Sequence, residues 1–244
     1  MYQFFVEDEQ VQAQEKIMIT GSDVNHIKNV LRMRAGERVR ISDASGKAYF
    51  CHLEEVRDDA VVATIDQVDE RGTELGNKII LFQGLPKGDK MELIIQKATE
   101  LGVSEIYPVA MKNCVVKLDD KKAQSKVTRW QTIAESAAKQ SKRTVIPKVQ
   151  MPVTWRKALD LASAMDVKLV PYENERGMEA TRETIRGIKK GQTVAIFVGP
   201  EGGFSPEEID LPEEYKRISL GRRILRTETA GFATLSMLVY ELEE

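Results

Sequence analysis

The chain has 244 residues, of which 42% are hydrophobic and 30% are charged, and its net charge is −2. This composition is typical of a folded protein with a sizeable core. No apolar run approaches the length needed to cross a bilayer, so we expect no membrane as a partner. Two cysteines and two histidines argue against a disulfide framework or a metal site, and the start has no signal-peptide pattern, so we expect a cytoplasmic protein.

The first seventy residues favour β-structure. Residues 43–46 provide turn chemistry between two expected strands, and one helix interrupts them, with Ser22 as its expected N-cap. The expected strands are residues 2–6, 16–20, 38–42, 48–56 and 60–68. We predict a small β-barrel with one helix, followed by a polar linker over residues 69–77.

The rest of the chain alternates between strands and helices. The expected strands are residues 78–83, 104–109, 145–149, 167–171, 193–198 and 217–220. Three expected helices begin at the caps Asp89, Thr154 and Ser205, and Gly102 ends the helix that Asp89 begins. Three more are expected over residues 124–142, 178–189 and 228–240. This alternation predicts a mainly parallel sheet with helices on both faces. We place the domain boundary between residues 71 and 72, so the domains are residues 1–71 and 72–244.

Positive charge is concentrated in three segments, although the whole chain is nearly neutral. Residues 28–40 carry five basic side chains against one acidic, residues 112–148 carry ten against three, and residues 216–227 carry five against none. Such segments indicate that a polyanion binds to the protein. The alternative is that they are solvated faces, as most charge runs are.

Several common catalytic patterns are missing from the sequence. There is no GxxxxGK[ST] and no GxGxxG after an early strand, which argues against a P-loop nucleotidase and a Rossmann-type dinucleotide site. HExxH and GxSxG are missing as well. The glycine-rich turns lie near the C-terminus instead, which favours a different α/β architecture.

Two turns near the C-terminus are the strongest functional signal. Residues 199–203, Gly-Pro-Glu-Gly-Gly, follow one expected strand, and residues 219–226 follow the next. Apolar side chains and bare backbone at such strand ends suit a flat ligand such as an adenine ring. The alternative for the first turn is a tight connection between a strand and a helix.

Five segments, in order along the chain, form a pattern that is specific when taken together. They are residues 26–32, 87–92 with 97–102, 135–143, 199–203 and 219–230. Together they resemble the RsmE family of ribosomal RNA methyltransferases, in the SPOUT (class IV) superfamily, over essentially the whole chain. One departure is Gln3, which stands where a basic residue is common in the family.

The resemblance implies an α/β fold in which a small PUA-like β-barrel for RNA binding precedes a SPOUT-type domain with a trefoil knot. It implies an enzyme that uses S-adenosyl-L-methionine to methylate N3 of a uridine in 16S ribosomal RNA. It also implies a homodimer, and the apolar last helix is a candidate dimer face, with a buried core helix as the alternative.

The resemblance places the cofactor across three loops. These are the loop after residues 167–170, the turn at residues 199–203 and the turn at residues 219–226. The expected cofactor-binding residues are Pro171, Tyr172, Glu173, Val198, Gly199, Pro200, Glu201, Gly202, Gly203, Ser219, Leu220, Gly221, Ile224, Leu225 and Arg226. For Gly202 we expect that a valine would occupy the path by which the cofactor approaches.

Two side chains are candidates for catalysis. Arg226 supplies a cation that favours the uridine anion, as a positive neighbour favours any charged base. The alternatives for Arg226 are phosphate binding or an ion pair with Glu228. Glu201 is a candidate acceptor of the N3 proton, with a structural role in the turn as the alternative.

Seven residues are expected to contact RNA, with solvated surface as the alternative. They are Lys28, Arg32, Arg34, Lys87, Gln140, Lys142 and Arg143. The partner is expected to be 16S ribosomal RNA or the small ribosomal subunit. Two rival functions stay open: a SPOUT enzyme that acts on another RNA position, and a non-catalytic RNA-binding protein of ribosome assembly.

Overall fold

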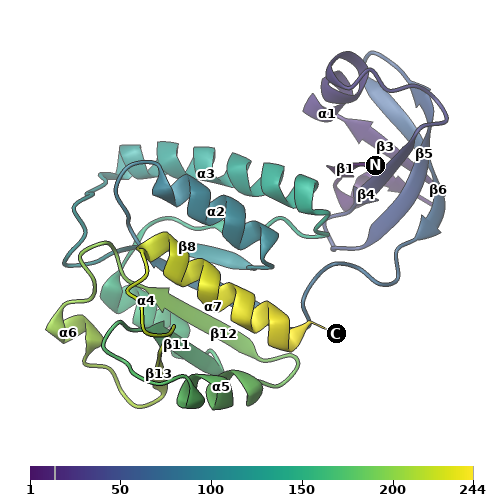
Figure 1. Cartoon of the computed structure of the whole chain (residues 1–244). Helices are drawn as coiled ribbons and strands as arrows, with labels where there is room; N and C mark the ends of the chain where they lie inside the picture. Colours follow the sequence, from purple (N-terminus) through teal and green to yellow (C-terminus); the bar gives the residue numbers. More distant parts are fainter. Residues whose placement is uncertain (14, 244) are drawn as a thin grey trace. The chain divides into compact units, whose positions relative to one another are not determined.

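The computed structural model describes residues 1–13 and 15–243, which form two compact units (Figure 1). Unit 1 consists of Met1–Glu74 together with Ala138–Val145. Unit 2 consists of Leu75–Ala137 and Ile146–Glu244. Each unit has its own hydrophobic core.

Unit 1 is built on a six-stranded sheet in the order β1-β4-β5-β6-β3-β2. Its strands are β1 (Tyr2–Phe5), β2 (Val11–Gln12), β3 (Lys16–Thr20), β4 (Arg38–Ser42), β5 (Ala48–Val56) and β6 (Ala60–Val68). Only the β1–β4 pair is parallel among the described pairs. The five expected strands are confirmed, and β2 is an addition too short for a hydropathy pattern to reveal.

A short helical segment follows β3 and precedes β4 in the chain. It comprises α1 (Ser22–Asn25) and a π-helical turn, η2 (His26–Val30), while a 3₁₀ turn, η1 (Asp8–Gln10), lies earlier. The prediction of Ser22 as the N-cap is wrong by one residue, because Gly21 takes that position with φ 75°. This backbone conformation suits glycine and lets the chain enter the helix sharply. Ile27 is fully buried and anchors the segment to the core.

The returning segment, residues 138–145, is held in unit 1 by buried polar contacts. The Arg143 side chain, 4% exposed, pairs with Glu74. Gln3 donates to the Arg143 carbonyl and Arg40 donates to the Lys142 carbonyl. Because buried polar groups need partners, these contacts fix the segment in place.

Unit 2 is built on a parallel sheet in the order β10-β8-β7-β12-β11-β13, with β9 paired to β8. Its strands are β7 (Lys78–Gly84), β8 (Glu105–Ala110), β9 (Lys148–Val149), β10 (Val153–Thr154), β11 (Val167–Pro171), β12 (Thr193–Val198) and β13 (Tyr215–Ile218). All described pairings are parallel, so the expected parallel sheet is confirmed. The last strand was predicted two residues too late, and residues 219–220 belong to the turn after it.

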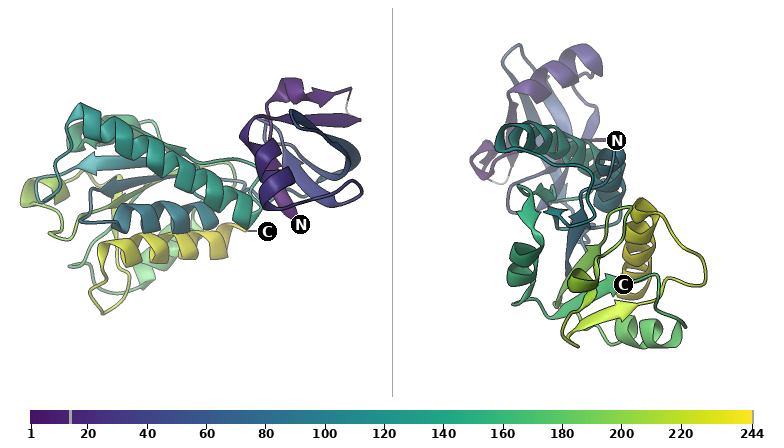
Figure 2. Two further views of the ribbon diagram at one scale, coloured as in Figure 1. Left: turned by 90° about the horizontal axis from the view of Figure 1, so that it is seen from above. Right: turned by 90° about the vertical axis from the view of Figure 1, so that its left-hand side faces the viewer.

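Six helices are described in this half of the chain, and helix α3 ends within unit 1. They are α2 (Lys90–Glu100), α3 (Asp120–Ser141), α4 (Trp155–Ala162), α5 (Glu179–Arg186), α6 (Pro206–Ile209) and α7 (Thr227–Leu242). Helices α2 and α7 lie side by side, with α7 against β12, whereas α4 packs against β8 and β10 (Figure 2).

The predicted helix caps are mostly confirmed, but two helix ends were misplaced: the helix expected from residue 124 begins at Asp120, and the one expected to end at residue 189 ends at Arg186. Thr154 accepts a hydrogen bond from the Lys157 N–H at 3.3 Å, and Ser205 forms a capping box with Glu208. Gly102 has φ 84°, as expected for the glycine after a helix. Asp89 occupies the N-cap position of α2, although its side chain makes no capping hydrogen bond.

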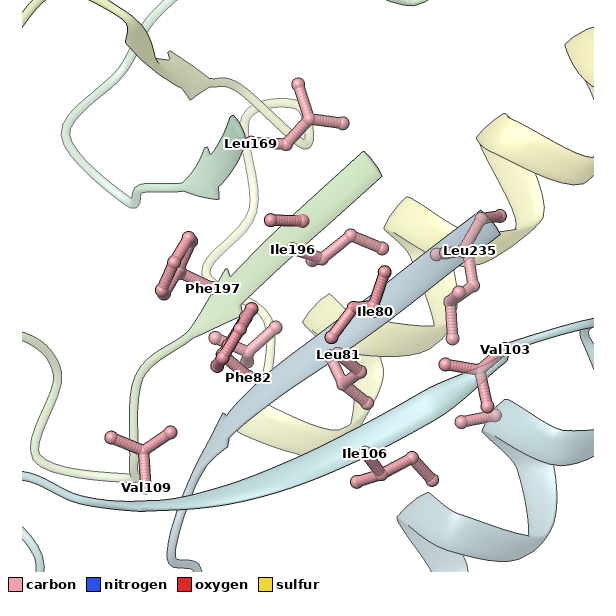
Figure 3. Close-up of a cluster of buried hydrophobic side chains, with 14 of the residues drawn as sticks. Ile80, Leu81, Phe82, Val103, Ile106, Val109, Leu169, Ile196, Phe197 and Leu235 are labelled. Carbon is pink, nitrogen blue, oxygen red and sulfur yellow. The ribbon is translucent and has the colours of Figure 1, made fainter. Parts of the chain in front are cut away.

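Stacked aromatic rings lie at the centre of the unit 2 core (Figure 3). The Phe82 ring stacks on Phe197 at 4.7 Å and on Tyr107 at 5.0 Å between centroids. The Trp155 ring of α4 meets the Phe197 ring edge-on at 5.5 Å. These contacts hold neighbouring strands in register.

No helix among the described residues is long and apolar enough to cross a membrane.

We expect Phe82→Ala to lower the free energy of unfolding by about 3–5 kcal/mol, because it leaves a cavity between two stacked rings. Urea-induced unfolding followed by circular dichroism measures this change. Tyr2→Ala, at a residue that is 51% exposed, serves as the control and should change stability little. Equal losses for the two variants would contradict a central role for Phe82.

Candidate active site

The described part of unit 2 contains a pocket of about 380 Å³ at one edge of its sheet. Its walls are the loops that follow β11, β12 and β13, with residues from the starts of α2 and α7. Strands β7, β12, β11 and β13 are neighbours and parallel, so their carboxyl ends meet at this edge. Ligands of open α/β sheets bind outside such carboxyl ends.

The first wall is the loop after β11. Pro171, Tyr172 and Glu173 line the pocket. The Tyr172 N–H donates to the Ile218 carbonyl at 3.0 Å, which ties this loop to the end of β13. All three expected residues of this loop are therefore at the pocket.

The second wall is the turn after β12. Five of its six expected residues line the pocket: Val198, Gly199, Pro200, Glu201 and Gly203. The Gly203 N–H donates to the Pro200 carbonyl at 2.9 Å, which closes the turn. Gly203 has φ 67°, a conformation that side chains disfavour, so a glycine is needed there.

Gly202 does not line the pocket, and the reason expected for a glycine there is wrong. A Cβ added at Gly202 would lie 2.9 Å from Asn113 Cβ, so it points to the segment after β8. The Asn113 side-chain amide donates to the carbonyls of Gly202 and Gly203 at 3.0 and 3.2 Å. A valine at 202 would therefore disturb the turn through Asn113 instead of occupying the ligand's path.

The third wall is the turn after β13. Leu220, Gly221, Ile224, Leu225 and Arg226 line the pocket. Ser219 does not, because it is buried beneath the turn. Its backbone N–H and carbonyl both bond the hydroxyl of Thr181 in α5, at 3.0 and 3.1 Å. Ser219 thus fixes the turn from below.

The start of α7 closes the pocket between the second and third walls. Thr227 is 6% exposed, and its hydroxyl donates to the Gly199 carbonyl at 2.6 Å. The same oxygen accepts from Gln83 Nε2 at 2.9 Å. A buried hydroxyl therefore links β7, the end of β12 and the first residue of α7.

The charges at the pocket are divided between paired and unpaired groups. Burial acts to raise the pKa of Glu201, but hydrogen bonds from Lys90 and from the N–H groups of Glu201 and Lys87 outweigh it and lower the pKa. A carboxylate held in this way is a weak proton acceptor. Arg223 and Arg226 are exposed, and within residues 1–13 and 15–243 neither guanidinium has a hydrogen-bond or ion-pair partner. Glu228 pairs with Lys90 instead of Arg226.

The expected RNA-contacting residues differ in their availability. Lys87, in unit 2, is exposed. In unit 1, Arg32, Arg34 and Gln140 are exposed, Lys28 pairs with Asp58 at the surface, and Lys142 is half-buried, where burial and then Arg40 lower its pKa. The expected RNA contact of Arg143 is wrong, because its side chain is buried against Glu74 and does not face solvent. Among the described residues, no cluster of histidine, cysteine and acidic side chains is arranged to hold a metal ion.

Sequence reasoning missed five residues that line the pocket: Lys90, Phe204, Arg223, Thr227 and Ala230. Lys90 lies within the segment 87–92 that carried the family resemblance, and the others are within four residues of expected ones. Proximity along the chain was therefore the available signal. The hydrogen bond from Thr227 to Gly199 spans 28 residues, so no local pattern reveals it.

We expect Thr227→Val to lower the free energy of unfolding by about 1–3 kcal/mol, because the Gly199 carbonyl and the Gln83 amide lose a buried partner. Thr227→Ser keeps the hydroxyl and is the matched control. Urea unfolding of both variants measures the difference. If valine and serine behave alike, the hydroxyl does not carry the link.

Sequence profiles of two RNA methyltransferase domains match the chain. The profile described as an RNA methyltransferase domain matches residues 73–239, and the one described as an RNA methyltransferase PUA domain matches residues 19–66. These matches confirm the expected arrangement of a PUA domain followed by an RNA methyltransferase domain. The trefoil knot stays a prediction.

Curated relatives match over the full length. The chain is 37% identical to ribosomal RNA small subunit methyltransferase E of Bacillus subtilis, covering 100% of this chain and 98% of the relative. It is 33% identical to the protein of the same name from Mesomycoplasma hyopneumoniae, covering 98% and 99%. The structure of such an enzyme from Neisseria gonorrhoeae, bound to S-adenosyl methionine, superimposes with a TM-score of 0.83 at 30% identity, covering 98% and 97%. The chain belongs to the ribosomal RNA small subunit methyltransferase E family.

Proposed function

We propose that this protein methylates N3 of a specific uridine in 16S ribosomal RNA of the small subunit, with S-adenosyl-L-methionine as the methyl donor. The observation that carries the proposal is the pocket at the carboxyl ends of β11, β12 and β13, with the unpaired Arg226 at its edge. The relatives named as small-subunit ribosomal RNA methyltransferases support the substrate class. The choice of uridine N3 follows from the family resemblance.

The residues of the pocket fit S-adenosyl-L-methionine. Leu220, Ile224 and Leu225 offer apolar contacts to a flat ring. The backbone at Gly203 and Gly221, with φ 67° and 104°, carries no side chain that would keep a ligand away. The volume of about 380 Å³ lies within the range of small-molecule sites. When bound, this cofactor supplies an electrophilic methyl group on a sulfonium.

Arg226 is our first candidate for the catalytic group. Uridine N3 is a weakly acidic imide that attacks as an anion, and a nearby cation favours that anion. Arg226 lines the pocket, whereas the Lys90 ammonium is already bound by two carboxylates. Holding the two reactants in line supplies roughly 7–11 kcal/mol of the barrier, so a dedicated base is not required.

We propose residues 1–71 as the RNA-binding domain and residues 72–244 as the catalytic domain. Arg32 and Arg34 are exposed in the first, and Lys87 is exposed in the second. Arginine suits bidentate contact with phosphate oxygens. We place the protein in the cytoplasm, with its ribosomal RNA substrate.

We also propose that the protein is a homodimer and that α7 forms part of its interface. The helix buries Leu235 and Leu238, yet Tyr240 is 88% exposed and Phe232 and Met237 are only half-buried. An apolar surface that remains on a helix already packed on one side suits a second copy of the chain.

Incubation of the protein with S-adenosyl-L-methionine and small-subunit ribosomal RNA tests the function. We expect 3-methyluridine at one position, detected by nucleoside mass mapping. Cofactor binding with a methyl group at another RNA position would favour the related enzyme. No cofactor binding at millimolar concentration would favour a non-catalytic RNA-binding protein of ribosome assembly.

Arg226→Ala should lower turnover about a hundredfold, as the loss of one group that stabilises a developing anion does. The affinity for S-adenosyl-L-methionine should change far less, since apolar and backbone contacts dominate the pocket. Steady-state methylation kinetics and calorimetric titration measure the two effects. Arg222→Ala, at an exposed neighbour outside the pocket, is the control. Equal losses of turnover and affinity would make Arg226 a binding residue only.

A further inference from the structure

Lys90 connects two carboxylates that come from different walls of the pocket. Its Nζ lies 2.9 Å from Glu201 Oε1, in the turn after β12. The same Nζ lies 3.4 Å from Glu228 Oε2, in the first turn of α7, which is an ion-pair distance without hydrogen-bond geometry. Lys90 itself lines the pocket and begins α2. One ammonium group therefore spans three segments far apart in sequence.

A second contact strengthens this connection at Glu201. The Lys87 backbone N–H lies 3.1 and 3.3 Å from the two Glu201 carboxylate oxygens. Glu201 is thus bound both by the backbone of the turn before α2, at Lys87, and by the side chain of the first residue of α2, Lys90. Because the side chains of Glu201, Lys90 and Glu228 are 25%, 30% and 13% exposed, water screens these charges only partly.

The pKa shifts of Lys90 and Glu201 both indicate that the two side chains interact as an ion pair. The hydrogen bond to Glu201 raises the pKa of Lys90, and the hydrogen bond from Lys90 helps to lower the pKa of Glu201 against the effect of burial. Each partner therefore stabilises the charged form of the other. Glu201 remains an anion that is committed to hydrogen bonds, which makes it a poor acceptor of a substrate proton.

Arg226 lies beside the same connection. The adjacent Thr227 is held to Gly199 by its hydroxyl, and Glu228 is held by Lys90. The backbone that carries Arg226 is thus fixed by two neighbours, while its guanidinium has no partner among the residues that the structure describes.

We propose that Lys90 is a positioning residue of the cofactor pocket: it binds Glu201 and Glu228 together and so fixes the turn after β12 against the start of α7. In this arrangement Glu201 holds its turn in place through Lys90 and is not the acceptor of the N3 proton. This inference rests on the proposed function. In the reaction, the N3–H bond breaks and its proton passes to solvent water, N3 bonds to the methyl carbon, and the bond from sulfur to that carbon breaks.

A double-mutant cycle tests whether Lys90 and Glu201 act together in fixing the pocket. We expect Lys90→Met and Glu201→Gln each to weaken S-adenosyl-L-methionine binding about tenfold in calorimetric titration, because either change releases the turn. The double variant should bind about as weakly as either single variant, whereas independent roles predict a loss of about a hundredfold. Methylation at saturating cofactor should fall less than affinity does.

Two further variants separate positioning from general destabilisation. Lys90→Arg keeps a cation that can bridge two carboxylates, and its affinity should stay within about threefold of the wild type. Lys97→Met combined with Glu100→Gln removes an ion pair of 2.8 Å on the same helix, away from the pocket, and should not change cofactor binding. Melting temperatures measured for every variant show whether it is folded.

Three results would overturn the inference. An additive double variant would mean that Lys90 and Glu201 act separately. A fall in turnover of more than a hundredfold for Glu201→Gln, with cofactor affinity kept, would identify Glu201 as the proton acceptor. A wild type that binds no S-adenosyl-L-methionine would overturn both the positioning role of Lys90 and the proposed function. A wild type that binds the cofactor but leaves ribosomal RNA unmethylated would sink the proposed function alone, because the binding cycle still decides the role of Lys90.

Discussion

The parallel alignment of β7, β12, β11 and β13 is the constraint on which the site depends. Their carboxyl ends meet at one edge of the sheet, and each of the last three strands leaves there as a loop that lines the pocket. The pocket exists because the buried apolar strands, with Phe82 and Phe197 stacked at their centre, hold these ends level.

Local chemistry was readable from the sequence where a single residue type decides the conformation. The capping residues Thr154 and Ser205 and the helix-ending Gly102 were predicted correctly, because their roles depend on near neighbours in the chain. Most residues of the three loops that line the pocket were predicted through the family resemblance, whereas the two glycine-bearing turns at residues 199–203 and 219–226 were visible in the sequence itself. The β13 boundary was missed because Ser219 and Leu220 continue the hydropathy pattern into the turn.

Long-range pairing was not readable from the sequence. Arg143 was expected to contact RNA, yet it is buried against Glu74, 69 residues earlier. Gly202 looked like a residue that faces a ligand, yet it faces Asn113, 89 residues earlier. In both cases the deciding partner lies in a distant segment of the chain, and no local periodicity carries that information. The same holds for Lys90, whose two carboxylates lie in other elements.

The return of residues 138–145 to unit 1 has a consequence for dissecting the protein. A fragment that ends at Glu74 would lack Arg143 and the Lys142 carbonyl. The Glu74 carboxylate would lose its arginine, and Gln3 and Arg40 would each lose one buried carbonyl acceptor. Unit 1 is therefore not a continuous stretch of chain that can be cut out whole: its last segment, residues 138–145, is synthesised about seventy residues after its final strand, β6, which ends at Val68.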